Sequence, residues 1–283
     1  MAVIRPRLMY LLIALAATVL GLVVFVRWVE PRIAFFPQPG EAETPRDFGV
    51  PFDAITIATA DGERVRAWKM TPPAPQAARA RIVYFHGNGG NLSNWSPILA
   101  GVARRGHAVL AIDYRGYGAS TGRPTERGLY RDVDAAVAVP WTDAEARRPL
   151  VYWGRSLGGA MAAYAATVRK PDGVIVESGF PSARAVVRSS PVLAVLSLFA
   201  SYRFPAGEYL NRANVPVLML HGNRDSVIPF ALGRELFDQV TAAKEFVTIP
   251  GGDHNDAAAP DPKAYWATID RFIASLRRGT PAS

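Results

Sequence analysis

The most constraining feature of this sequence is the segment Gly-Arg-Ser-Leu-Gly at residues 154–158. An apolar run, residues 150–153, precedes it, and a stretch rich in small residues, 159–167, follows it. This context predicts a strand, a sharp turn and a helix, the arrangement that a Gly-X-Ser-X-Gly turn needs to present its serine. The backbone at such a serine is strained, and side chains at the two glycine positions would obstruct the turn. We therefore interpret Ser156 as a nucleophile.

Short apolar runs that alternate with helical stretches define the rest of the expected fold. The dipeptide Asp61-Gly62 lies between two strand-like segments, residues 54–59 and 64–70, and predicts an antiparallel hairpin at a sheet edge. Six further apolar runs follow, at residues 81–85, 108–113, 150–153, 173–177, 216–220 and 245–249. Continuous apolar strands separated by helices are typical of a parallel sheet covered on both faces. We expect an α/β fold with a mostly parallel, eight-stranded sheet and its chemistry at the carboxyl ends of the strands.

Length and composition narrow the class of protein. A chain of 283 residues, 49% of them hydrophobic, can bury the core of one large α/β domain. It has no cysteine, which excludes disulfides and thiol nucleophiles, and its four histidines never pair at metal-ligand spacing, so we expect no metal site. The net charge of +8 is spread through the chain rather than gathered into a basic stripe, so we expect no nucleic-acid partner.

An uncharged apolar stretch covers residues 8–26. At about 1.5 Å per residue, a helix of this length spans roughly the 30 Å hydrocarbon core of a bilayer. We interpret residues 1–30 as a membrane anchor with one transmembrane helix. A cleaved signal peptide is the alternative, although the stretch is longer than a usual signal core and no Ala-X-Ala site follows it before Arg27.

The charges that flank this stretch are nearly balanced. Arg5 and Arg7 lie on one side, and Arg27 and Arg32 lie on the other, so the positive-inside count is almost tied. The free amino terminus favours an N-in orientation, which places the catalytic domain outside the cytoplasm. Residues 31–50 are rich in proline, glutamate and aromatic residues without periodicity, so we expect a tether that lies on the domain surface. The catalytic domain is expected in residues 51–283.

A glycine-rich segment, His-Gly-Asn-Gly-Gly-Asn at residues 86–91, follows the third expected strand. Acyl transfer through a serine needs two backbone N–H donors that point at the developing oxyanion, one from the residue after the nucleophile and one from this loop. We assign these donors to Leu157 and Asn88. His86 ends the strand, and we expect it to be structural because the base of this fold comes last in the chain.

The expected base and acid follow the last two strands. Asp225 comes shortly after residues 216–220, and His254 comes shortly after residues 245–249. The order Ser156, Asp225, His254 is the order of a catalytic triad on this kind of sheet. His254 would take the serine proton and return it to the leaving group, while Asp225 would hold the imidazole tautomer and stabilise the imidazolium.

Three other aspartates compete for the role of the acid. Asp113 belongs to an arginine-rich loop, and Asp253 and Asp256 flank the histidine on its own loop. We expect Asp253 or Asp256 to cap or fix that loop instead. Of the remaining histidines, we expect His107 to be solvated in a loop and His221 to be a structural strand end.

Several motifs together carry a family resemblance. Besides the N-terminal anchor they are residues 86–91, Asp-Tyr-Arg-Gly-Tyr-Gly-Ala-Ser at 113–120, Gly-Arg-Ser-Leu-Gly-Gly at 154–159, His-Gly-Asn-Arg-Asp at 221–225 and His-Asn-Asp at 254–256. With them the chain resembles the α/β-hydrolase superfamily, and within it the membrane-anchored Bem46-like group, which includes the α/β-hydrolase-domain type 13 and type 17 proteins. The resemblance implies serine hydrolase activity on esters or thioesters without a cofactor. Asp253 departs from the pattern, because relatives often carry a small residue there.

Residues 181–215 are the expected source of specificity. They contain an apolar stretch at 191–200 followed by three aromatic residues, and they could form a small lid over the serine or an ordinary helix on the sheet. A lid of this kind would suit acyl chains. The sequence thus predicts a membrane-anchored serine hydrolase of carboxylic esters or thioesters, acting on small-molecule or lipid-like substrates. A serine peptidase of the same fold and a catalytically silent binding protein are the alternatives.

Overall fold

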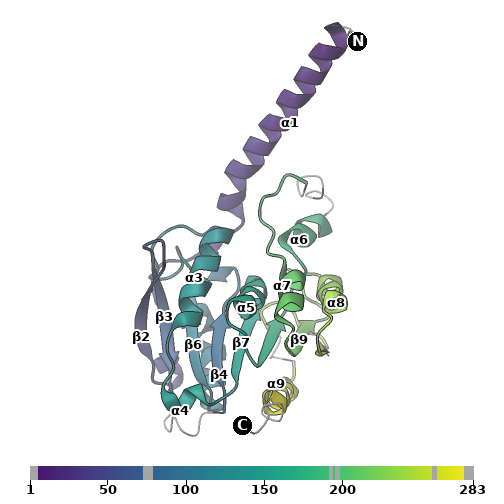
Figure 1. The fold of residues 1–283 in the computed structure, drawn as a ribbon. Coiled ribbons are helices and arrows are strands. Elements are labelled where there is room, and N and C mark those ends of the chain that lie inside the picture. The colour runs from purple at the N-terminus through teal and green to yellow at the C-terminus, as the bar shows by residue number, and fades with distance from the viewer. Residues whose placement is uncertain (1–5, 73–78, 191–193, 195–197, 257–259, 277–283) are drawn as a thin grey trace.

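Eight strands form the central sheet of the computed structural model, which describes residues 6–72, 79–190, 194, 198–256 and 260–276 (Figure 1). The order across the sheet is β10-β9-β8-β7-β4-β6-β3-β2. The strands are β2 (Asp53–Ala58), β3 (Arg64–Met70), β4 (Arg81–Phe85), β6 (Ala108–Ile112), β7 (Leu150–Arg155), β8 (Gly173–Glu177), β9 (Val217–Gly222) and β10 (Lys244–Ile249). Only the β2–β3 and β3–β6 pairs are antiparallel. The predicted mostly parallel, eight-stranded sheet is therefore confirmed.

Helices cover both faces of this sheet, as its continuous apolar strands predict. One face carries α2 (Leu92–Arg104) and α9 (Pro262–Leu276), and the other carries α3 (Glu126–Ala138), α5 (Leu157–Val168), α7 (Ala206–Ala213) and α8 (Phe230–Gln239). Side chains alternate between the two faces along each strand. In β4, Val83 and Phe85 pack with α3 and α5, whereas Ile82 and Tyr84 pack with α2 and α9.

The parallel pairing brings four loops to one edge of the sheet. β4, β7, β8, β9 and β10 run in the same direction, so the segments that follow their last residues emerge on the same side. The loop after β4 begins at His86, the turn after β7 begins at Ser156, and Asp225 and His254 follow β9 and β10. The topology therefore gathers the residues that the sequence selected as candidates.

A long apolar helix, α1 (Pro6–Ile33), projects away from the sheet (Figure 1). It is long and apolar enough to cross a membrane, and none of its most apolar window is buried in the protein. The chain then returns to the domain through β1 (Phe36–Pro37), which pairs in parallel with β5 (Gly89–Gly90), and through the short helix η1 (Pro45–Phe48). Phe35 is buried against Tyr202 and Phe204, and β1 pairs with the loop after β4, so this segment is packed on the domain surface.

The segment between β8 and β9 divides into two parts. α7 packs against α5, and its Leu210 is fully buried, so this part is an ordinary helix on the sheet. The preceding α6 (Ala183–Ser189) is only partly buried. Most of the apolar stretch 191–200 lies outside the described residues, which here include only 194 and 198–200.

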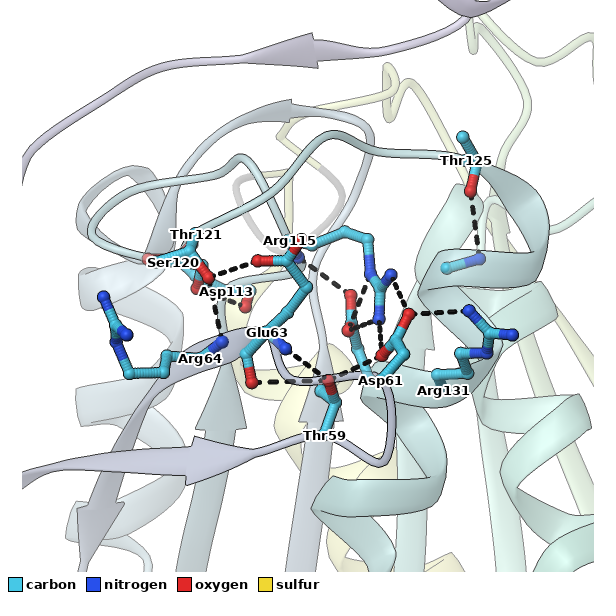
Figure 2. A network of polar contacts seen from close by, with 12 residues as sticks. Thr59, Asp61, Glu63, Arg64, Asp113, Arg115, Ser120, Thr121, Thr125 and Arg131 are labelled. Atoms are coloured by element: carbon cyan, nitrogen blue, oxygen red, sulfur yellow. Dashed lines mark hydrogen bonds and ion pairs between the residues drawn. The ribbon is translucent and has the colours of Figure 1, made fainter.

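A polar network fastens the β2–β3 hairpin to the loop after β6 and to α3 (Figure 2). The guanidinium of Arg115 donates to Asp61 at 2.8 and 3.0 Å and to Asp132 at 2.8 and 3.0 Å. Arg131 donates to the same Asp61 carboxylate at 2.6 Å. Burial raises the pKa of Asp132 to about 6, although its bonds with Arg115 lower it. The positive charge of Arg115 therefore balances the negative charge of the fully buried Asp132 carboxylate.

We predict that Arg115→Met destabilises the protein strongly. The substitution leaves Asp132 buried without its cation, and removal of one partner from such a pair costs about 3–5 kcal/mol. Arg131→Met is the matched control, because Arg131 is 38% exposed and binds the same Asp61. Its loss should cost less than about 1 kcal/mol. Denaturant unfolding measures both, and equal stability of the two variants would contradict the assignment.

Candidate active site

Ser156 lies in a strained turn between β7 and α5. Its φ of 54° and ψ of −119° are unusual for a residue with a side chain, and its N–H donates to the Glu177 carbonyl at 2.8 Å. A Cβ at position 154 would stand 1.8 Å from the Gly158 carbonyl oxygen. A Cβ at position 158 would stand 1.9 Å from the Phe85 carbonyl oxygen. The steric reason predicted for the two glycines is confirmed, since backbone occupies the space on both sides.

Asp225 and His254 meet across two neighbouring loops. Nδ1 of His254 lies 2.9 and 3.0 Å from the two carboxylate oxygens of Asp225. The same carboxylate accepts hydrogen bonds from the backbone N–H groups of Val227 at 3.0 Å and Ile228 at 2.7 Å. These contacts orient the carboxylate towards the imidazole, as a charge partner for a catalytic histidine requires.

His221 contacts both Asp225 and the loop that carries it. Its Nε2 lies 3.0 Å from the Ile228 carbonyl oxygen and 3.4 Å from Oδ2 of Asp225, and its ring is buried. Burial alone raises the pKa of Asp225, but hydrogen bonds from His221, His254 and the Ile228 backbone outweigh burial and hold this pKa well below its usual range. Asp225 is therefore a carboxylate at neutral pH. His221 has the structural place that the sequence predicts for it.

The competing aspartates have other partners. Oδ1 of Asp113 accepts the Leu92 N–H at 2.8 Å and lies 3.3 Å from the buried His86 ring. Oδ1 of Asp253 accepts the N–H and hydroxyl of Ser226 and the N–H of His254, at 2.7 to 2.8 Å. Asp253 thus connects the histidine loop to the Asp225 loop. This agrees with the expectation that Asp253 or Asp256 fixes the histidine loop.

Asp256 contacts the histidine loop, whereas His107 is buried at the sheet. Asp256 accepts the N–H of Asp253 at 2.6 Å, so it also fixes the histidine loop. The expectation that His107 is solvated is wrong. Its side chain is 1% exposed, because it stands at the start of β6, a strand in the interior of the sheet.

The loop after β4 is held in place from two sides. The Asn88 side chain donates to the Ala34 carbonyl at 2.7 Å, and the Tyr117 hydroxyl lies 2.9 Å from both the carbonyl and the side-chain oxygen of Asn88. His86 Nδ1 lies 2.6 Å from the Gly87 carbonyl, so this ring stabilises the loop. The backbone of Asn88 therefore has a fixed position next to the turn at Ser156.

A cavity of about 940 Å³ joins these elements. Four of the five predicted site residues line it, namely Ser156, His254, Asn88 and Leu157, and Asp225 lies directly behind His254. Most of the other lining side chains are apolar, and many of them come from α1 and the segment after it, from α2, and from α6 and the segment after it. At this size the cavity is at the upper end of the usual range for small-molecule sites. Among the described residues, no group of three or more His, Cys, Asp and Glu side chains could hold a metal ion.

Sequence reasoning missed Arg155. Its guanidinium Nε donates to the His254 carbonyl oxygen at 3.1 Å, and Nη2 binds the same oxygen. Burial alone lowers the pKa of Arg155, but the charge of Glu177 raises it above its ordinary value. The Tyr265 hydroxyl donates to Glu177, which pairs with Arg155 in the sheet, so α9 contacts the strand next to Arg155. No local pattern could reveal it, since residue 155 is the variable position of the motif.

Comparison with known proteins places this arrangement in a family. A model of the α/β hydrolase fold matches residues 80–175. YfhR of Escherichia coli, an uncharacterized protein, is 32% identical over 84% of this chain and 86% of its own length. An uncharacterized membrane protein of Saccharomyces cerevisiae is 31% identical over 82% of both chains, and bem46 of Schizosaccharomyces pombe is 28% identical over 95% and 94%. The chain belongs to the Bem46-like α/β-hydrolases.

Solved structures support the fold of this Bem46-like hydrolase. The Pyrococcus furiosus esterase Pf2001 superposes with a TM-score of 0.69 at 18% identity, covering 85% of this chain and 97% of that one. The esterase RhEst1 of Rhodococcus superposes with a TM-score of 0.59 at 20% identity, over 79% and 99%. At such identities the agreement concerns the fold.

We predict that Gly158→Ala destabilises the Bem46-like hydrolase severely. Its Cβ would collide with the Phe85 carbonyl, a backbone atom that cannot move aside without shifting β4. The expected cost exceeds about 3 kcal/mol, at the severe end for one substitution. Gly89→Ala is the control, because a Cβ there meets nothing within 4 Å, and it should change stability by less than about 1 kcal/mol. Thermal unfolding of both variants tests this, and a stable Gly158→Ala protein would contradict it.

Proposed function

We propose that this protein is a membrane-anchored serine hydrolase that cleaves carboxylic ester or thioester bonds. The observation that carries the proposal is the hydrogen-bonded pair of Asp225 and His254, which opens on the same cavity as the strained Ser156. Nucleophile, base and acid on three loops of one sheet edge are what acyl transfer needs. The esterase folds among the solved structures agree with this chemistry.

In the proposed reaction, Nδ1–H of His254 donates to Asp225, which leaves Nε2 as the base. Nε2 takes the proton of the Ser156 hydroxyl while Oγ attacks the carbonyl carbon. The tetrahedral intermediate collapses, the protonated His254 gives its proton to the departing alcohol or thiol, and an acyl-enzyme remains. Water, deprotonated by His254, then releases the carboxylic acid and restores the serine.

The developing oxyanion would be held by the backbone N–H groups of Asn88 and Leu157. Leu157 is the first residue of α5, where helix N–H groups have no partner within the helix. Asn88 is fixed by Ala34 and Tyr117. One such donor contributes about 2.7–4 kcal/mol of transition-state stabilisation.

The membrane part of the proposal rests on α1. Its length and apolar character suit a bilayer crossing, and a yeast relative is named a membrane protein. We propose residues 1–30 as the anchor, 31–50 as the tether and 51–283 as the catalytic domain, with the part of residues 181–215 that precedes α7 contributing a small lid. The position of the catalytic domain outside the cytoplasm stays a prediction, because the arginines on the two sides of α1 are nearly balanced.

We expect Ser156→Ala and His254→Ala each to abolish hydrolysis of p-nitrophenyl esters. Residues that act as one catalytic unit lose on the order of 10⁶ in turnover when one member is removed. Ser275→Ala is the control, because this serine is on α9 and bonds only to the Phe272 carbonyl among the described contacts. A fluorophosphonate probe should label the parental and Ser275→Ala proteins alone. Retention of most activity by Ser156→Ala would refute the mechanism, and a silent binding protein would show neither turnover nor labelling.

We further expect Arg155→Met to lower kcat. Without the guanidinium the His254 carbonyl loses both of its described donors, and small displacements of a catalytic group cost about tenfold to a hundredfold. The control is Arg224→Met, since Arg224 is exposed in the neighbouring loop. Steady-state kinetics measure the effect in both variants. An unchanged kcat in Arg155→Met would show that the loop keeps its position without this contact.

A further inference from the structure

The end of α1 nearest the domain is part of the cavity that contains Ser156. Phe25, Val26, Val29 and Ile33 line it together with the candidate catalytic residues. Spacings of three and four residues place Val26, Val29 and Ile33 on one face of the helix. Val26 is 9% exposed, whereas Val24, on another face, is 60% exposed. The candidate membrane helix thus turns one face towards the site.

Glu30 fastens this part of α1 to the segment after α6. Its carboxylate accepts the Ser201 N–H at 2.9 and 3.0 Å and the Tyr202 N–H at 3.0 Å, and it also binds the Ser201 hydroxyl. Four contacts from one carboxylate to residues more than 170 positions away fix the helix end against the catalytic domain. The wall formed by α1 is therefore held in place by polar contacts.

Aromatic side chains continue this apolar wall. The ring centroid of Phe35 lies 5.4 Å from that of Tyr202 and 6.4 Å from that of Phe204, and all three residues line the cavity. On α6, Ala183, Val186 and Val187 line it as well. Apolar surface thus extends from α1 to the turn at Ser156, which favours a hydrocarbon chain as the occupant.

The exposed residues of the same turns have the character of a membrane interface. Trp28 is 59% exposed, and the Arg32 guanidinium lies 4.1 Å from the centre of its ring. Arg27 is also exposed. Tryptophan and arginine at the end of an apolar helix mark the headgroup region of a bilayer. The cavity wall at residues 25–33 therefore coincides with the level at which acyl chains meet the headgroups.

We propose that the last turns of α1 form one wall of an acyl-binding site, and that the substrate is an ester whose long acyl chain is held in the bilayer. The acyl chain passes along α1 into the cavity without crossing water. Its methylene groups therefore avoid the exposure to water that is unfavourable for a dissolved acyl chain. Its ester carbonyl then reaches Ser156. The inference rests on the proposed function, and it adds the source of the substrate and the route by which it enters.

The test uses the full-length protein in phosphatidylcholine vesicles. p-Nitrophenyl laurate, incorporated in the vesicles, is compared with p-nitrophenyl acetate in the surrounding buffer. Val29→Trp places a large ring on the cavity wall, and we expect the ratio of kcat/KM for laurate to that for acetate to fall at least about tenfold. The control is Val24→Trp, the same change on the exposed face, for which the ratio should stay within about twofold of the parental value.

A second variant covers the possibility that Val29→Trp does not fold. Val29→Ala removes wall contacts without adding bulk, and it should lower the same ratio by about threefold. Fluorophosphonate labelling of each variant shows that its site is assembled. A ratio unchanged in both Val29 variants, or lowered as much by Val24→Trp, would overturn the inference while Ser156-dependent acetate hydrolysis still supported the proposed function. Absence of acetate hydrolysis in the parental protein would refute the proposed function itself.

Discussion

The backbone contact between the Ser156 turn and the end of β4 is the constraint on which the rest of the site depends. Gly158 approaches the Phe85 carbonyl so closely that no Cβ fits, and Gly154 meets the Gly158 backbone in the same way. This contact places the first turn of α5 beside the loop that carries Asn88. Two backbone N–H groups from distant parts of the chain can then face one point in space, because the strands that carry them are adjacent in the sheet.

The opposite side of the site is built from side-chain contacts. Asp225 and His254 belong to two different loops, and contacts of three side chains hold these loops in place. His221 supports the carboxylate, Asp253 bridges the two loops, and Arg155 binds the His254 carbonyl. Since Arg155 belongs to the serine turn itself, one buried guanidinium positions the proposed base, His254, relative to the proposed nucleophile, Ser156. Such preorganisation lowers the reorganisation needed during the reaction.

Much of this could be predicted because the signals are local. The central strands β4, β6, β7, β8 and β9 are mostly apolar runs. The residues after β4, β7, β9 and β10 carry recognisable motifs, so parallel topology alone brings Asp225 to His254. Contacts between distant segments left no such signal. Arg155 occupies the variable position of its motif, and the burial of His107 follows from strand order rather than from its neighbours in sequence. The contact of Glu30 with the segment after α6 could not be predicted, because the apolar character of its helix is already explained by a membrane span.

Because α1 lines the cavity, a membrane anchor of this kind would also fix the orientation of the domain. A flexible tether would hold the catalytic domain near a bilayer without fixing its orientation. Here β1 pairs with β5, Asn88 binds Ala34, and Glu30 binds the segment after α6, so these contacts join the end of α1 to the loop after β4 and to the domain. A helix embedded in the bilayer would therefore set both the depth and the direction of the cavity mouth. Substrate selection would then depend on where an ester lies in the membrane as well as on its chemical structure.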